Sequence, residues 1–310
     1  MTHLALGPGR EFDAIRALLA RWGGAAQGIG DDAALLDVPS GARLVVSVDA
    51  SVEDVHFKRE WLTPEEIGWR ATAAAISDLA AMAAHPLGLL VAICVPPRWT
   101  ADLGALGDGI AAAARAAEMP IIGGDTTSGE QLTLSLSVLG HARTPLRRSG
   151  ARIGDIIYVT GALGGPSAAL RALAVGELPT TLHRARFAHP EPRLAAAHWL
   201  AERGATAAID ISDGLSADLR HLAAASGVAI ELDVGAVPVL SGATLDDALG
   251  GGEEYELAVA SGALDTDAFE LAIGLSLTAV GRVVAGPPRV RGKQGDERVD
   301  LPGGHDHLST

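Results

Sequence analysis

Five short acidic motifs, each set among small residues, are the part of this sequence most able to do chemistry. They are Gly30-Asp31-Asp32-Ala33, Ser47-Val48-Asp49-Ala50-Ser51, Ser77-Asp78-Leu79, Gly123-Gly124-Asp125-Thr126-Thr127 and Asp210-Ile211-Ser212-Asp213-Gly214. Small neighbours allow a ligand to approach the backbone, and carboxylate oxygens are the ligands that Mg²⁺ prefers. The motifs therefore predict a site that holds a polyphosphate through divalent cations.

The charge of the chain favours phosphate binding through metal ions over direct binding. The formal net charge is −14, and the only lysines among the 310 residues are Lys58 and Lys293. An acidic chain is a poor partner for nucleic acid, which needs positive patches. Neither lysine lies in a G-x-x-x-x-G-K-[ST] pattern, which excludes a P-loop. Metal ions must therefore neutralise most of the charge of any nucleotide bound here.

Alternating strand and helix patterns in both halves of the chain must position these carboxylates. The pattern predicts strands over residues 44–48, 87–95, 121–123, 132–139, 156–160, 207–211, 228–232, 256–260 and 278–284. It predicts helices over 11–21, 63–84, 100–118, 215–225 and 267–273, and one that begins near Pro166. The fold class is α+β. A polar, turn-rich stretch at 143–155 predicts two domains, residues 1–146 and 147–310.

Asp78 is the most informative single residue, because it interrupts an otherwise apolar helix where a buried charge is costly. The alternative is a solvated helix face. Asp49 and Asp125 are expected at the ends of their strands, from which carboxylates project into a common cleft. A turn-forming aspartate is the alternative for either one taken alone.

The second half of the chain offers further candidate ligands. Asp210 ends a strand, and Ser212 or Asp213 is expected to cap the helix that follows. The stretch 251–256 contains Glu253 and Glu254 after two glycines and reads either as a ligand loop or as an acidic surface loop. The glycine-rich stretch 161–165 is a candidate anion-binding nest before a helix.

Composition indicates a globular chain without a membrane span. Hydrophobic residues make up 48% of the sequence, but no run of about 18 or more apolar residues occurs. The first residues lack the pattern of a signal peptide. The single cysteine, Cys94, excludes an intramolecular disulfide and is expected to fill the core. We expect a cytoplasmic enzyme.

The ordered series of motifs, from Gly28-Ile29-Gly30-Asp31-Asp32 to Asp306-His307, resembles the thiamine-monophosphate kinase family. That family belongs to the superfamily of aminoimidazole-ribonucleotide synthetase and selenophosphate synthetase. The segments that carry the resemblance are Ser77 to Met82, Gly123 to Thr127, Arg148 to Ala151, Asp210 to Leu215 and Gly251-Gly252-Glu253. The resemblance implies two α/β domains of the aminoimidazole-ribonucleotide synthetase type, with N-terminal domains that pair in a homodimer. It also implies ATP-dependent phosphorylation of thiamine monophosphate to thiamine diphosphate.

The resemblance assigns roles to individual residues. Several Mg²⁺ ions would be held by Asp32, Ser47, Asp49, Asp78, Asp125, Asp210 and Asp213, and by the carbonyl of Val48, a position where relatives often carry threonine. ATP would contact Gly124, Asp125, Arg148 and Ser212. Thiamine monophosphate would contact His56, Glu253 and His305, the last standing where relatives often have an aromatic residue. Either Asp31 or Asp32 can be the ligand of that pair.

The implied reaction needs no protein nucleophile, because a phosphate oxygen is already ionised at neutral pH. The obstacle is repulsion between two anions, about 4 kcal/mol for unit charges 4 Å apart at an effective dielectric near 20. One rival is another superfamily member that activates an amide oxygen with ATP. A selenophosphate synthetase would carry a reactive cysteine near the N-terminus, and none precedes Cys94. Another rival is a non-catalytic nucleotide-binding regulator.

Overall fold

The computed structural model describes residues 10–29 and 33–304 and divides them into two compact units. The first unit contains the described residues up to Leu79 together with Ala84–Thr144. The second contains Ala80–Ala83 and the described residues from Pro145 onward. No helix in the described chain combines the length and apolar character needed to cross a bilayer.

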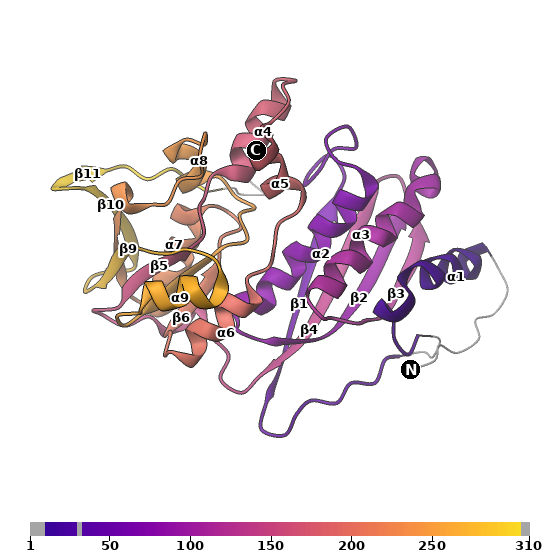
Figure 1. The fold of residues 1–310 in the computed structure, drawn as a ribbon, viewed down its shortest axis with the longest axis horizontal. Coiled ribbons are helices and arrows are strands. Elements are labelled where there is room, and N and C mark those ends of the chain that lie inside the picture. The colour runs from indigo at the N-terminus through magenta and orange to yellow at the C-terminus, as the bar shows by residue number, and fades with distance from the viewer. Residues whose placement is uncertain (1–9, 30–32, 305–310) are drawn as a thin grey trace. The chain divides into compact units, whose positions relative to one another are not determined.

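A four-stranded sheet with helices on one face forms the first unit (Figure 1). Its strand order is β1-β4-β2-β3, so β1 and β3 are the two edge strands. The elements are α1 (Arg10–Trp22), β1 (Arg43–Val52), α2 (Pro64–Ala81), β2 (His85–Val95), α3 (Leu103–Ala116), β3 (Ile121–Ser128) and β4 (Thr133–Ala142). The long helices α2 and α3 lie side by side on the sheet in Figure 1.

Local sequence explains how these elements begin and which face they bury. Thr63 caps α2 as predicted: its backbone N–H donates to the Glu66 carboxylate (2.8 Å), and Glu66 N–H donates to the Thr63 hydroxyl (3.3 Å). The helix ends at Ala81 rather than near Ala84, because Ala83 adopts a left-handed backbone (φ 49°) before β2 begins. In β4 buried and half-buried residues alternate throughout, which confirms the predicted half-buried strand.

The edge strand β1 presents an apolar surface to solvent. Its residues alternate in burial, and the outward set comprises Leu44, Val46 and Val48, which are 50%, 58% and 64% exposed. Leu44 and Val46 lie opposite His141 and Leu139 of β4. An unpaired edge strand with exposed β-branched and aliphatic side chains is a surface that natural proteins usually cover.

A seven-stranded mixed sheet organises the second unit. Its order is β11-β10-β7-β9-β5-β8-β6. The strands are β5 (Ile156–Thr160), β6 (Ala207–Asp210), β7 (Ala229–Asp233), β8 (Leu257–Ser261), β9 (Leu277–Val284), β10 (Arg289–Gln294) and β11 (Glu297–Val299). The helices are α4 (Gly165–Ala174), α5 (Thr181–Ala188), α6 (Leu194–Glu202), α7 (Leu215–Ser226), α8 (Leu245–Gly250) and α9 (Thr266–Ile273).

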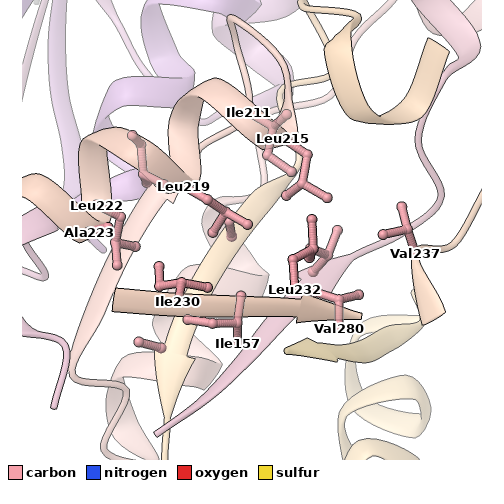
Figure 2. Close-up of a cluster of buried hydrophobic side chains, with 14 of the residues drawn as sticks. Ile157, Ile211, Leu215, Leu219, Leu222, Ala223, Ile230, Leu232, Val237 and Val280 are labelled. Carbon is pink, nitrogen blue, oxygen red and sulfur yellow. The ribbon is translucent and has the colours of Figure 1, made fainter. Parts of the chain in front are cut away.

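One hydrophobic core of this unit forms where α7 packs on the sheet. Figure 2 shows Leu215, Leu219 and Leu222 of α7 above Ile230 of β7 and Ile157 of β5, and all five are fully buried. The spacing of three to four residues along α7 places its leucines on one face, as an amphipathic helix requires. This packing fixes the loop between β6 and α7, which carries the Asp210 motif.

Several elements were absent from the sequence prediction. They are α5, α6 and α8 with the strands β10 and β11. The predicted helix over 100–118 is divided into a 3₁₀ turn, Pro97–Asp102, and α3. These differences leave the predicted α+β class intact.

Candidate active site

Asp78 faces the sheet rather than solvent. It is half-buried on α2, and the Ser47 hydroxyl of β1 donates to its Oδ2 at 2.5 Å. Ser47 and Asp49 are two residues apart on a strand and therefore point to the same face of β1. Hydroxyl and carboxylate oxygens from α2 and β1 thus meet at this point of the first unit.

Asp49 and Asp125 lie within strands, which corrects the expectation that they follow strand ends. Asp49 pairs with Leu136 inside β1, and Asp125 pairs with Ala92 inside β3. Each carboxylate accepts the N–H of the next residue, at 2.8 Å from Ala50 and 2.9 Å from Thr126. The sequence signal was misread because glycine and aspartate usually end strands, whereas edge strands tolerate them.

The sheet order separates these two aspartates within one chain. β1 and β3 are opposite edges with β4 and β2 between them. Three strand spacings of about 4.8 Å place the two backbones roughly 14 Å apart. Asp49 and Asp125 therefore do not lie next to each other in the first unit, and the cleft that they share stays a prediction.

Two further predicted residues lie near these carboxylates in the sequence. Val48 is 64% exposed, so its side chain points away from Ser47 and Asp49 while its backbone stays in the strand ladder. Gly124 pairs with Val91, whose carbonyl oxygen would lie 1.9 Å from any added Cβ. Only glycine fits this position without separating β3 from β2.

His56 is held in a turn that fixes its ring. The Val52 N–H donates to His56 Nδ1 at 3.1 Å, and the His56 N–H donates to the Val52 carbonyl at 2.9 Å. A neutral imidazole that accepts at Nδ1 carries its proton on Nε2. The half-buried ring is therefore suited to donate a hydrogen bond through Nε2 to an anionic oxygen.

In the second unit the Asp210 motif forms the loop between β6 and α7. Asp210 ends β6 and is 4% exposed, while Ser212 and Asp213 are half-buried. Neither Ser212 nor Asp213 caps α7, contrary to the sequence prediction. The N-cap is Gly214, and its positive φ of 113° is one that glycine adopts readily.

Asp218 replaces the expected cap and was missed by sequence reasoning. Its Oδ2 accepts the N–H groups of Ser212, Asp213 and Gly214, each at 3.1 Å. Burial, the largest cause, and the charges of Asp210 and Asp213 together raise the pKa of Asp218 to about 8, although the backbone donors of Asp213 and Ser212 oppose the rise. An aspartate in the first turn of a helix was the available signal.

The predicted substrate loop lies directly against the Asp210 motif. Glu253 N–H donates to the Ser212 carbonyl at 2.7 Å, and Tyr255 N–H donates to the Ile211 carbonyl at 2.9 Å. A Cβ on Gly252 would lie 2.2 Å from the Ser212 carbonyl oxygen. The structure therefore brings Glu253 together with Ser212 and Asp213.

The glycine-rich stretch 161–165 binds a carboxyl group of the protein itself. Gly161 and Gly164 have positive φ angles of 62° and 98°, and the Gly164 N–H donates to Glu254 Oε1 at 2.5 Å. Arg148 is exposed in a short 3₁₀ turn, and its carbonyl accepts the Ser226 hydroxyl at 2.6 Å. Asp32, with its neighbour Asp31, and His305 lie outside the described residues.

The donor chemistry of these loops fits Mg²⁺. Within 10–29 and 33–304, no three histidine, cysteine, aspartate or glutamate side chains form a cluster suited to one metal ion. Mg²⁺ in phosphate-transfer sites is usually held by one or two carboxylates, with waters and substrate oxygens completing the octahedron. Asp78 with Ser47, and Asp210 with Asp213, supply such sparse oxygen sets.

Comparison with known protein families identifies both halves of the chain. Residues 30–142 match the model of the AIR synthase related protein N-terminal domain, and residues 152–293 match that of its C-terminal domain. These matches and the two-unit architecture define the class, a two-domain AIR synthase-related protein. The expected fold is therefore confirmed.

Individual relatives narrow the class. Thiamine-monophosphate kinase of Salmonella typhimurium is 40% identical over 278 residues, which cover 83% of this chain and 84% of that protein. The Bacillus subtilis thiamine-monophosphate kinase is 35% identical over 298 residues, which cover 88% of this chain and 91% of that protein. The crystal structure of the Stenotrophomonas maltophilia thiamine-monophosphate kinase is 37% identical with a TM-score of 0.81, covering 91% and 96%. The chain belongs to the thiamine-monophosphate kinase family.

A further solved structure bears on ligands. It is named AaThiL complexed with AMPPCP and TMP, is 27% identical, and superposes with a TM-score of 0.75 over 95% of this chain and 96% of that one. The hydrogenase maturation protein HypE of Escherichia coli, at 22% identity and a TM-score of 0.77, shares the fold.

Proposed function

We propose that the protein transfers the γ-phosphoryl group of ATP to thiamine monophosphate, giving ADP and thiamine diphosphate. The observation that carries the proposal is the contact between two loops, in which Glu253 is bonded to the backbone of Ser212. This contact joins the expected substrate residue to the expected nucleotide and metal residues. The relatives named thiamine-monophosphate kinase, and the relative complexed with AMPPCP and TMP, support the same reaction for this chain.

Within this proposal the chain binds and orients two anions. His56 donates from Nε2 to the phosphate of thiamine monophosphate, and Glu253 contacts the same substrate together with His305. Ser212, Gly124 and Arg148 contact ATP, with Arg148 contributing a guanidinium suited to phosphate oxygens. Holding the acceptor oxygen in line with the γ-phosphorus lowers the barrier by orientation rather than by a covalent step.

Several Mg²⁺ ions are the cofactor that the donor set suits. We assign them to Asp32, Ser47, the carbonyl of Val48, Asp49, Asp78, Asp125, Asp210 and Asp213. When bound, Mg²⁺ supplies the positive charge that offsets repulsion between the two phosphates. The chain itself supplies less positive than negative charge, with 24 lysine and arginine residues against 38 aspartate and glutamate residues and a formal net charge of −14.

We further propose a homodimer in which both protomers complete each site. The exposed apolar side chains Leu44 and Val46 on edge strand β1 support pairing of the N-terminal sheets. Asp49 and Asp125 lie on opposite edges of one sheet. A second copy whose β3 edge lies along β1 brings Asp125 of one protomer to Asp49 of the other. We place the enzyme in the cytoplasm, where a chain with one cysteine needs no disulfide.

The test is a product analysis. Purified protein is incubated with ATP, Mg²⁺ and thiamine monophosphate, and the products are separated by chromatography. We expect ADP and thiamine diphosphate in equal amounts, and no product when thiamine, which lacks the acceptor phosphate, replaces thiamine monophosphate. Release of inorganic phosphate without thiamine diphosphate, or no ADP at all, would overturn the proposal.

A further inference from the structure

The loop between α8 and β8 is held in an unusual backbone conformation. Glu253 and Tyr255 both have left-handed φ angles, 64° and 53°, although neither is glycine. Such residues are strained and persist only where the surrounding structure fixes them. The residue between them is Glu254, so its side chain is the natural place to look for what fixes the turn.

The Glu254 carboxylate is buried and anchored on separate elements. It is 2% exposed; Oε1 accepts the Gly164 N–H at the start of α4, and Oε2 lies 3.5 Å from Arg186 Nη2 of α5. Arg186 also donates to Glu256 Oε1 at 2.8 Å, and more distantly to the Glu254 carbonyl at 3.4 Å. The turn is therefore attached at its side chain to α4 and α5 and at its backbone to the Asp210 motif.

A second arginine completes the buried cluster. Arg193 donates to both oxygens of Glu256, at 2.6 and 2.9 Å, and the Thr160 hydroxyl donates to Glu256 Oε2 at 2.6 Å. Glu256 is fully saturated by these partners. Glu254, by contrast, has no hydrogen-bond partner at Oε2 among the described residues, and burial raises its pKa to about 8.

This asymmetry separates two tasks. Glu256 binds the cluster together, whereas Glu254 is tied to it by one backbone N–H and a longer contact with Arg186. Glu254 stabilises the core less than Glu256 does, because a buried carboxyl group that makes only some of its hydrogen bonds is costly. Its retained contacts all act on the turn that carries Glu253.

We propose that Glu254 is a positioning residue, which fixes the left-handed turn 253–255 through Gly164 and Arg186 and so aims Glu253 at the substrate beside the Asp210 motif. The inference rests on the proposed function for the identity of the substrate. It assigns Glu254 no contact with substrate or metal. Substitution of Glu254 should therefore weaken the binding of thiamine monophosphate and leave the binding of ATP unchanged.

The experiment compares Glu254→Gln with a matched control, Asp155→Asn. Asp155 is a buried residue of the same unit and is 8% exposed. Its carboxylate accepts hydrogen bonds from the Thr206 hydroxyl and the Arg152 N–H, both outside the loop. We expect Glu254→Gln to raise KM for thiamine monophosphate about tenfold, with KM for ATP unchanged. Isothermal titration with thiamine monophosphate alone should show the same loss. The control should leave both KM values unchanged.

A second readout does not depend on catalysis. Hydrogen exchange at the Glu253 and Tyr255 amides, which donate to Ser212 and Ile211, should quicken in Glu254→Gln and not in Asp155→Asn. If Glu254→Gln does not fold, Arg186→Lys removes the bridge to the same cluster and should show both effects. Unchanged exchange overturns the inference, as does a rise in KM that is equal for both substrates. If the wild-type protein makes no thiamine diphosphate, the proposed function is wrong. The hydrogen-exchange measurement then decides by itself whether Glu254 fixes the turn.

Discussion

Replacing Gly252 with alanine tests whether the contact between the Glu253 loop and the Asp210 motif is needed for activity. The added Cβ would lie 2.2 Å from the Ser212 carbonyl oxygen, whereas ordinary contact begins at 3.4 Å. The two backbone segments must separate by about 1 Å to admit it. Gly252 does not adopt a left-handed backbone conformation, so the perturbation is purely steric.

The size of the effect follows from that displacement. Separating the segments breaks the 2.7 Å bond from the Glu253 N–H to the Ser212 carbonyl, which costs about 1 kcal/mol of stability. A misplacement of about 1 Å between substrate-positioning groups lowers a rate by roughly 100-fold. We therefore expect kcat/KM for thiamine monophosphate to fall about 100-fold while unfolding shifts only modestly.

The assay follows ADP formation at varied thiamine monophosphate and is paired with urea unfolding. Gly262→Ala is the control, because nothing lies within 4 Å of a Cβ at that position in the same unit. It should match wild type in both measurements. Gly252→Ala activity within twofold of the control would show that the two loops need not touch, and would refute the reasoning.

Three further predictions concern the carboxylates. Asp49→Asn and Asp125→Asn should each lower kcat by more than they weaken thiamine monophosphate binding; titration calorimetry showing lost binding with unchanged kcat contradicts this. An equal mixture of the two variants, with subunit exchange checked by native mass spectrometry, should regain roughly a quarter of wild-type turnover. No recovery in exchanged dimers places both aspartates of a site in one chain. Because the folded-state pKa of Glu254 is raised from 4.5 to about 8, the folded protein retains a proton that the unfolded chain loses, and stability should fall as pH rises from about 5 to 8. Glu254→Gln should flatten that slope by about 1.4 kcal/mol per pH unit in urea titrations; parallel wild-type and variant curves count against it.

The sequence was most informative where local chemistry decides structure. The capping box at Thr63 and the alternation of β4 were predicted because each depends on residues within a few positions of one another. The α+β class followed from the same local patterns. The helices α5 and α6 were missed, since their short apolar patterns gain stability mainly from tertiary packing.

The site was harder to predict, because its geometry depends on pairing between distant segments. Asp49 and Asp125 look alike in sequence, and only the strand order shows that they lie on opposite edges. Asp218 and Glu254 serve backbone N–H groups of other loops, at Ser212 and Gly164. Neither role leaves a spacing signal in the sequence. The order of the motifs indicated the family. The contacts that hold the motifs in place could be seen only in the structure.

The central claim is that divalent cations, held by aspartates from separate loops, bring the two phosphate-bearing substrates together. A crystal of the protein with Mn²⁺, a non-hydrolysable ATP analogue and thiamine monophosphate tests it, because Mn²⁺ is located by its anomalous scattering. We predict metal peaks bonded to Asp78 and to the Asp210–Asp213 loop, each also touching a phosphate oxygen. Both substrates bound with no metal peak at these carboxylates would contradict the account.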